Sequence, residues 1–188
     1  MKTTTVLITT GGTTTFKRLL DEVTRDEFFE FMSSLGVKKV YIQYGNEIIG
    51  EEHISQQYIS QLLAFEGNQG RYKLIDIELF AFSNTIDKYI ESSDLILTHG
   101  GTGSILDCLR LNKKVIVIPN ETLMNNHQVE IANAFESNNY LKSLSVSDIN
   151  TTRGHEVIQG LLSNTIEITP LPNPNTSIID TIIAQELK

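Results

Sequence analysis

Residues 94–109 read DLILTHGGTGSILDCL, and this stretch decides the fold. Residues 94–98 form a short apolar run of the kind found in buried strands. Residues 99–103 are a glycine-rich turn, and over residues 104–111 the apolar positions recur at helical spacing. A strand, a tight loop and a helix in this order are the repeating unit of a parallel α/β sheet.

The same alternation runs through most of the chain. Apolar, β-branched runs predict further strands, and apolar positions at helical spacing predict helices between them. We expect strands at 6–10, 40–45, within 72–80 and at 115–119, and helices over 16–35, 54–65, 86–90 and 126–137. The predicted fold class is therefore α/β, a Rossmann-like parallel sheet with helices on both faces.

The pattern weakens after residue 140. Prolines within residues 171–175 cannot continue a helix, and the isoleucine-rich residues 177–187 predict a final amphipathic helix. We interpret residues 1–188 as one domain, with a core at 1–140 and a C-terminal segment at 141–188. The isoleucine-rich helix could cover either its own core or a partner.

Composition narrows the class of protein. The 188 residues carry 15 Lys and Arg against 23 Asp and Glu, a net charge of −8, which argues against nucleic acid or an anionic membrane as a direct partner. No apolar run reaches the ~18 residues of a membrane span. The first residues lack a signal-peptide core, so we expect a soluble, cytosolic chain. The single cysteine, Cys108, excludes an intrachain disulfide, and its helical spacing from Ile105 and Leu109 predicts a core position.

The glycine-rich turn after residue 98 has the features of an anion site. Gly100, Gly101 and Gly103 let backbone N–H groups approach a ligand, and the start of the following helix adds roughly half a positive charge. The loop is neither a P-loop nor a dinucleotide fingerprint, because it lacks a Gly-Lys pair and a GxGxxG pattern. A tight turn without a ligand is the alternative, but three glycines exceed what a turn requires. We therefore favour a phosphate site that also includes Thr102 and Ser104.

Asp107 lies one turn into that helix. Side chains on a helix lean toward its N-terminus, so this carboxylate could reach over the loop and accept hydrogen bonds from a ribose diol. A favourable charge near a helix start, or a solvated residue, is the alternative.

A second glycine loop follows the first strand. Gly11 and Gly12 precede three threonines, and these small residues offer backbone and hydroxyl hydrogen-bond donors to a ligand. Taken by itself, the loop would be interpreted as an ordinary threonine-rich turn. Ligands bind at the carboxyl ends of the strands in open α/β sheets, so both glycine loops are expected at one edge.

Amide side chains open the helix expected after the fifth strand. Asn125, Asn126 and Gln128 could bind sugar hydroxyls as donors and acceptors, or an asparagine could simply cap the helix. His53 and His155 have no partner pattern and are expected on the surface.

These segments together resemble a known family. Residues 98–107, THGGTGSILD, with Pro119 and residues 125–128, NNHQ, look like the donor-binding half of GT-B glycosyltransferases. The likeness is greatest to the soluble catalytic subunit of the two-chain UDP-N-acetylglucosamine transferases of N-glycan assembly. It is more distant to the bacterial N-acetylglucosaminyltransferase that completes lipid II. The resemblance runs from residue 6 to about residue 135 and implies a single GT-B donor-binding domain.

The resemblance also implies roles for individual residues. The first glycine loop would lie near the diphosphate and sugar, residues 81–84 near uracil, the second glycine loop at the diphosphate, and Asp107 at the ribose. The bacterial relative has Arg at the position of His99 and Glu at that of Asp107. The donor-binding residues expected on this basis are Gly11, Gly12, Thr13, Phe82, Ser83, His99, Gly100, Gly101, Thr102, Gly103, Ser104, Asp107, Asn126 and Gln128.

The reaction implied is an inverting transfer of GlcNAc from UDP-GlcNAc to dolichyl-diphosphate-GlcNAc, the second step of N-glycan precursor assembly. The chain has room for one GT-B domain, so the acceptor half is expected on a membrane-anchored partner subunit. Such a heterodimer would place the chain at the cytosolic face of the endoplasmic reticulum membrane. No metal and no cofactor are expected, because no DxD element is present.

The catalytic base remains open between His99, His127 and a residue of the partner. A non-catalytic UDP-sugar sensor or a scaffold subunit is the alternative function. A sugar-nucleotide epimerase or hydrolase is disfavoured, because such enzymes carry both domains in one chain.

Overall fold

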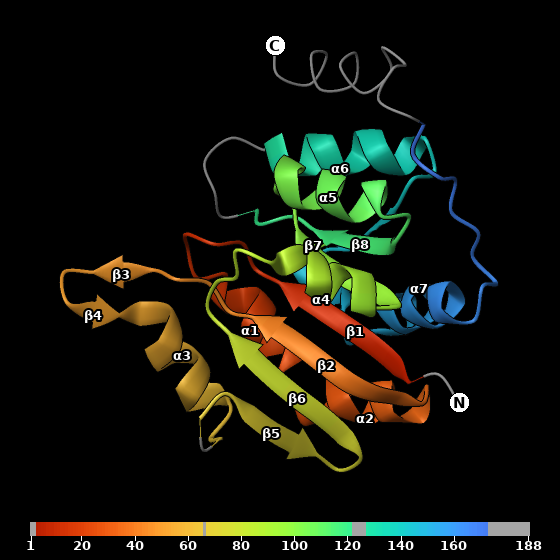
Figure 1. Ribbon diagram of the computed structural model, residues 1–188. Coiled ribbons are helices and arrows are strands. Elements are labelled where there is room, and N and C mark those ends of the chain that lie inside the picture. Colours follow the sequence, from red (N-terminus) through yellow and green to blue (C-terminus); the bar gives the residue numbers. More distant parts are fainter. Residues whose placement is uncertain (1–2, 66, 122–126, 173–188) are drawn as a thin grey trace.

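The structure is a computed structural model that describes residues 3–65, 67–121 and 127–172 (Figure 1). Within these residues, seven strands form one sheet in the order β5-β6-β2-β1-β7-β8-β9. The strands are β1 (Thr4–Thr9), β2 (Val37–Gln43), β5 (Gln69–Tyr72), β6 (Ile75–Phe80), β7 (Leu95–His99), β8 (Lys114–Ile118) and β9 (Lys142–Ser143). A separate hairpin joins β3 (Ile48–Ile49) to β4 (Glu52–His53).

The sheet is parallel from β6 to β9, and β5 pairs antiparallel with β6 at one edge. The chain builds β1, β2 and β6 in one direction from the centre, then returns to add β7, β8 and β9 on the other side of β1. The order therefore reverses between β1 and β7, which is where doubly wound sheets bind ligands. The Rossmann-like prediction is confirmed, and the antiparallel edge strand is a departure from it.

Helices cover both faces of the sheet (Figure 1). Side chains alternate along β1, so Val6 and Ile8 face one core while Leu7 faces the other. The first core receives α1 (Lys17–Val23), α2 (Asp26–Ser34), α3 (Ile54–Leu62) and α7 (Thr152–Leu162). The second receives α4 (Ile86–Ser92), α5 (Thr102–Arg110) and α6 (His127–Ser137).

Several boundaries differ from the sequence predictions. The helix expected over 16–35 is two helices, α1 and α2, and Gly36 follows with φ +78°. The helix expected from residue 104 begins at Thr102, so the last glycine of the turn, Gly103, belongs to its first turn. The hairpin β3–β4, the strands β5 and β9, and α7 were not predicted. The helix expected over 177–187 lies outside the described residues.

The structure also tests the burial predicted for three side chains, Cys108, His53 and His155. Cys108 is 1% exposed and lies in the second core, as predicted. His53 is exposed, whereas His155 is half-buried, with its ring stacked on Phe31 and the ring centroids 3.7 Å apart. The surface prediction holds for His53 and only in part for His155, because helical position alone did not reveal the facing aromatic ring on α2.

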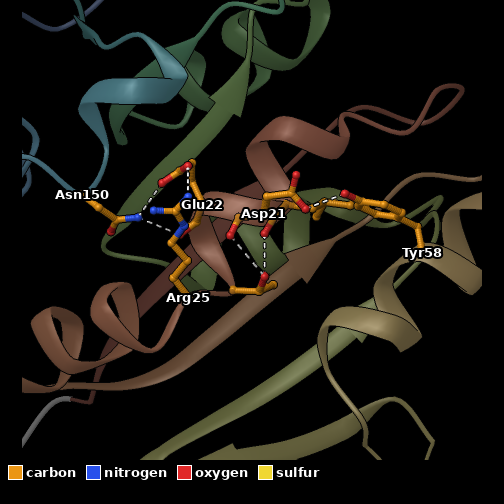
Figure 2. A network of polar contacts seen from close by, with 7 residues as sticks. Asp21, Glu22, Arg25, Tyr58 and Asn150 are labelled. Carbon is orange, nitrogen blue, oxygen red and sulfur yellow. Dashed lines mark hydrogen bonds and ion pairs between the residues drawn. The ribbon is translucent and has the colours of Figure 1, made fainter.

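Polar contacts fix α1, which follows the first glycine loop (Figure 2). Tyr58 on α3 donates to Asp21 Oδ1 at 2.5 Å, and this hydrogen bond raises the pKa of Tyr58 to about 12. Asn150, just before α7, donates from Nδ2 to the Glu22 carbonyl and to Glu22 Oε2, both at 2.9 Å. Arg25 pairs with Glu22 at 2.9 Å. Elements far apart in sequence therefore hold α1 from two sides.

No helix among the described residues has the length and apolar character required to cross a membrane.

Candidate functional site

A cavity of about 150 Å³ opens at the carboxyl edge of the sheet, where β1 and β7 end. The loop after β1, His99 at the end of β7 and residues that follow β8 form its walls. Its lining residues are Thr10, Gly11, Gly12, Thr13, Thr14, Phe16, His99, Asn120 and Gln128. Because β1 and β7 are adjacent and parallel, both glycine loops leave the sheet at this edge, as predicted, and both pack against His99.

His99 lies between the two glycine loops. A Cβ built on Gly11 would lie 3.0 Å from His99 Nε2, and one built on Gly101 would lie 2.3 Å from the same atom. Gly11 also has φ +89°, a conformation that favours glycine. Both loops therefore need glycine where they meet the imidazole ring.

The imidazole of His99 is held in its neutral form. Burial lowers the pKa of His99, and the backbone of Thr9 opposes this effect only in part. Among the described residues, Nδ1 is buried and has no partner with full hydrogen-bond geometry. The ring thus supplies no formal charge to the cavity near pH 7, whereas an arginine at the same position would supply a positive charge.

Gln128 joins the third side of the cavity to the second glycine loop. A Cβ on Gly100 would lie 2.5 Å from Gln128 Cβ, so the start of α6 packs directly on the loop. Gln128 Oε1 accepts a hydrogen bond from the Asn120 backbone N–H at 2.9 Å. The amide is therefore held in one orientation, with its NH₂ group left to donate.

The N-terminus of α5 follows the second glycine loop. Gly101 is the N-cap residue, and no side chain caps the helix there. The N–H groups of the first helical turn have no acceptor within the helix. The helix therefore offers a partial positive charge at Thr102, Gly103 and Ser104, as an anion site requires.

Phe82 and Ser83 follow β6 at the same edge of the sheet. Phe82 is 56% exposed, yet its ring would lie 3.2 Å from a Cβ on Gly12. Ser83 Oγ accepts from the Thr85 N–H at 3.1 Å, so it shapes the turn before α4. An exposed aromatic ring beside the first glycine loop is a surface on which a planar base could stack.

Of the predicted site residues, five line the cavity, namely Gly11, Gly12, Thr13, His99 and Gln128. The others lie away from the lining or outside the described residues, and those away from it are Phe82, Ser83, Gly100, Gly101, Thr102, Gly103, Ser104, Asp107 and His127. Asp107 is half-buried in the second turn of α5 and does not line the cavity. His127 is exposed at the start of α6, with Nδ1 3.4 Å from Glu130 Oε2. Asn126 lies outside the described residues, so its predicted role stays a prediction.

Sequence reasoning missed four lining residues, namely Thr10, Thr14, Phe16 and Asn120. Asn120 had a usable signal, because it stands directly after a predicted strand and its Pro119, at the edge where ligands bind. Thr10 and Thr14 flank the glycines already chosen. Phe16 had no such signal, because its apolar side chain suggests only helix packing.

A larger depression of about 380 Å³ lies at the opposite edge of the sheet, where β8 begins. Its two lysines hold backbone groups in place. Lys113 donates from Nζ to the carbonyls of Glu91 and Ser93, and Lys114 donates to the carbonyl of Leu161. These contacts indicate a structural role, at the ends of α4 and α7.

No group of three or more His, Cys, Asp or Glu side chains that could hold a metal ion occurs in the described part of the chain.

Comparison with known proteins identifies the family. Residues 5–172 match the family described as "Glycosyltransferase family 28 C-terminal domain". The chain belongs to this family of glycosyltransferase domains. The fold and the glycine loops at the switch point of the sheet agree with that membership.

Curated relatives share one name. A Candida albicans protein named "UDP-N-acetylglucosamine transferase subunit ALG13" is 35% identical, over 97% of this chain and 74% of its own length. A Saccharomyces cerevisiae protein of the same name is 32% identical, over 97% of this chain and 95% of its own. The resemblance to transferase subunits stated from the sequence is thereby confirmed.

Solved structures agree. The NMR solution structure of ALG13 matches with a TM-score of 0.63 at 27% identity, covering 100% of this chain and 98% of that chain. The crystal structure of Acinetobacter baumannii MurG matches with a TM-score of 0.58 at 17% identity, covering 88% of this chain and 42% of that chain. The second likeness concerns the fold alone.

Proposed function

We propose that the chain is the donor-binding subunit of an inverting N-acetylglucosaminyltransferase. UDP-GlcNAc would bind at the carboxyl edge of the sheet, in the cavity between the two glycine loops. The acceptor would be dolichyl-diphosphate-GlcNAc, carried to the site by a membrane-anchored partner subunit at the cytosolic face of the endoplasmic reticulum membrane. The relatives' shared name, a UDP-N-acetylglucosamine transferase subunit, supports both the donor and the existence of a partner.

The observation that carries this proposal is that the first glycine loop, His99 and Gln128 line one cavity, while Gly100 and Gly101 of the second glycine loop pack against Gln128 and His99. Backbone N–H groups of the loop after β7 and the start of α5 suit a diphosphate. The fixed amide of Gln128 suits sugar hydroxyls, and the exposed ring of Phe82 suits a uracil. Asp107, near the same helix start, is the proposed ligand of the ribose diol.

The bond changes follow from an inverting displacement. The acceptor O4 would attack C1 of GlcNAc, and the bond from C1 to the UDP phosphate oxygen would break. The negative charge that develops on UDP would face the α5 N-terminus, and the proton on O4 would pass to a base. Neutral His99 is in the correct protonation state for this base. Exposed His127 could act as the base only if the acceptor reached it. A residue of the partner subunit could equally be the base.

Energetics favour dependence on a partner. A 10⁶-fold acceleration requires about 8 kcal/mol of transition-state stabilisation. A helix terminus contributes roughly 0.3–2 kcal/mol toward a phosphate. Orientation of the acceptor and exclusion of water can contribute ~7–11 kcal/mol, and these need the second subunit.

The test is reconstitution with separate binding and turnover measurements. NMR titration of the chain with UDP and UDP-GlcNAc should move the amides of both glycine loops. Transfer to dolichyl-diphosphate-GlcNAc should require the membrane-anchored partner and should survive EDTA. Binding without transfer in the complete complex would indicate a UDP-sugar sensor, and no binding would indicate a scaffold; robust transfer by the chain alone would refute partner dependence.

A further inference from the structure

The base of the β3–β4 hairpin contacts the first glycine loop at Thr15. The Thr15 N–H donates to Glu47 Oε2 at 3.0 Å, and Thr15 Oγ1 lies 2.7 Å from Ser55 Oγ. The Glu47 N–H donates to Ser55 Oγ at 2.9 Å. Glu47 directly precedes β3 and Ser55 follows β4, so both ends of the hairpin meet on one residue of the loop.

These three residues form a closed ring of hydrogen bonds. Because Ser55 Oγ accepts from the Glu47 N–H, its own proton is available to Thr15 Oγ1. Hydrogen bonds from the Thr15 side chain and backbone lower the pKa of Glu47, so the carboxylate stays ionised as an acceptor. Ser55 is 1% exposed, so water competes little for its hydroxyl.

Neighbouring contacts extend this support along the loop. The Asn46 N–H donates to the Gly12 carbonyl at 3.2 Å. Gly45 has φ +91°, and a Cβ there would lie 3.0 Å from the Thr14 carbonyl oxygen. Residues 45–47 therefore follow the loop from Gly12 to Thr15 at close range.

The loop needs such support because its own sequence does not fix its shape. It is built from glycine and threonine, and Thr13 and Thr14 are exposed. Glycine in particular has a large conformational freedom to lose on ordering. A loop that is already held in the bound shape binds its ligand more tightly, because less ordering remains to be done.

We propose that Glu47 and Ser55 are positioning residues that hold residues 11–13 in the shape that receives the donor. They touch Thr15 and not the cavity, since neither lines it. The inference rests on the proposed function, because it assumes that residues 11–13 contact the UDP-sugar. It adds residues on the hairpin that neither the sequence motifs nor the cavity lining includes.

The test measures loop order and donor affinity separately in the full chain. Hydrogen exchange of the Thr15 amide is measured without ligand, and the Kd for UDP is measured by NMR titration. Glu47→Ala should speed Thr15 exchange by about tenfold or more and weaken UDP binding by about 5- to 50-fold. This is less than the roughly 10- to 150-fold value of a hydrogen bond to a charged group, because the lost bond orders the loop and does not touch UDP. Ser55→Ala should act in the same direction. The fold-loss of UDP affinity in the double variant should be smaller than the product of the two single-variant losses, because both changes break the same ring of hydrogen bonds.

Two further variants make the result specific. Glu47→Gln keeps an oxygen acceptor for the Thr15 N–H and should restore binding to within about threefold of the unaltered chain. Glu52→Ala removes an exposed carboxylate from the same hairpin and should change neither measurement. If Glu47→Ala does not fold, Ser55→Ala and Glu47→Gln decide the question by the same two measurements.

Distinct outcomes separate this inference from the proposed function. If the unaltered chain binds UDP while Glu47→Ala and Ser55→Ala bind it equally well, the positioning role is overturned and the donor site stands. Unchanged Thr15 exchange in these variants would also overturn it. If the unaltered chain and its complex fail to bind UDP while Thr15 exchange still responds, the donor site is overturned and the hydrogen-bond ring has a structural role only.

Discussion

The imidazole of His99 lies over the Cα of Gly101, close enough that a Cβ there would meet Nε2 at 2.3 Å. The same atom would lie 3.0 Å from a Cβ on Gly11, so one side chain packs against both glycine loops. The two loops therefore share one packing partner. Changes at either glycine should act through the position of His99.

Gly101→Ala should displace the His99 ring toward the cavity. Overpacking a filled site costs typically 1–3 kcal/mol, so the free energy of unfolding should fall by about that amount. Urea unfolding and the His99 ring resonances in NMR spectra would measure both effects. Gly103→Ala is the matched control, since a Cβ there meets nothing within 4 Å; alanine in the helix should stabilise by up to ~1 kcal/mol. Equal stability of the two variants would contradict the packing argument.

Asp107→Ala should weaken UDP binding and leave the fold intact. The proposed ribose contact is made to a charged acceptor, and its loss is worth about 1.5–3 kcal/mol, or roughly 10- to 150-fold in Kd. The affinities of the chain for UDP and for inorganic pyrophosphate would be compared by NMR titration. Only UDP should respond to the substitution, because pyrophosphate has no ribose. Unchanged affinity for UDP would remove Asp107 from the site.

Acid should destabilise the chain through His99. Its pKa is lowered in the folded state, so below the ordinary value of 6.5 the unfolded chain binds a proton that the folded chain does not. The unfolded state then holds more protons, and stability falls as the pH drops from about 6.5 toward the folded pKa. The stability is fully present above that window. His99→Gln should flatten this part of the profile in urea unfolding, whereas His53→Gln, at an exposed position, should not. An identical slope in all three proteins would rule out His99 as its cause.

Cys108 should resist thiol reagents while the chain is folded. Burial, and next the charge of Asp107, raise its pKa to about 12, so almost no thiolate exists at pH 8. Iodoacetamide should modify the folded chain very slowly and the urea-unfolded chain at the rate of a free cysteine. Mass spectrometry would follow both reactions. Rapid labelling without urea would indicate that α5 opens locally.

The central α/β repeat and the position of the ligand site at the carboxyl edge of the sheet could be predicted from the sequence. Apolar runs and glycine-rich loops that follow strands are local signals, visible without knowledge of the fold. The strand β5, with the sequence QGRY, has no apolar run, and it exists because it pairs with β6. Tertiary pairing of this kind is invisible to periodicity.

The missed helix α7 shows a second limit. It contains Gly154 and Gly160, which ordinarily weaken a helix. The folded chain needs both: a Cβ on Gly154 would lie 2.1 Å from the Asp148 carbonyl oxygen, and one on Gly160 would lie 2.5 Å from Ile166 Cδ1. These glycines allow close packing, so their meaning depends on neighbours that the sequence did not place.

The candidate site was predicted in the same uneven way. The glycine loops, His99 and Gln128 carry recognisable motifs; the first loop, His99 and Gln128 line the cavity, and the second loop packs against His99 and Gln128. Asn120 carries no motif, only its place after a predicted strand, and the hairpin residue Glu47 carries neither, because its contact with Thr15 arises from where two loops meet in space.

The two loops of the site extend from adjacent strands in the middle of the sheet. Thr9 of β1 is paired with Thr98 of β7, and both side chains are almost wholly buried with their hydroxyl oxygens 3.4 Å apart. Separating the loops would mean unzipping the centre of the hydrophobic interior, which is the last part of a protein to open. The relative position of the two loops is therefore fixed before a nucleotide binds. Nucleotide binding should persist under thermal fluctuations that loosen only the outer strands.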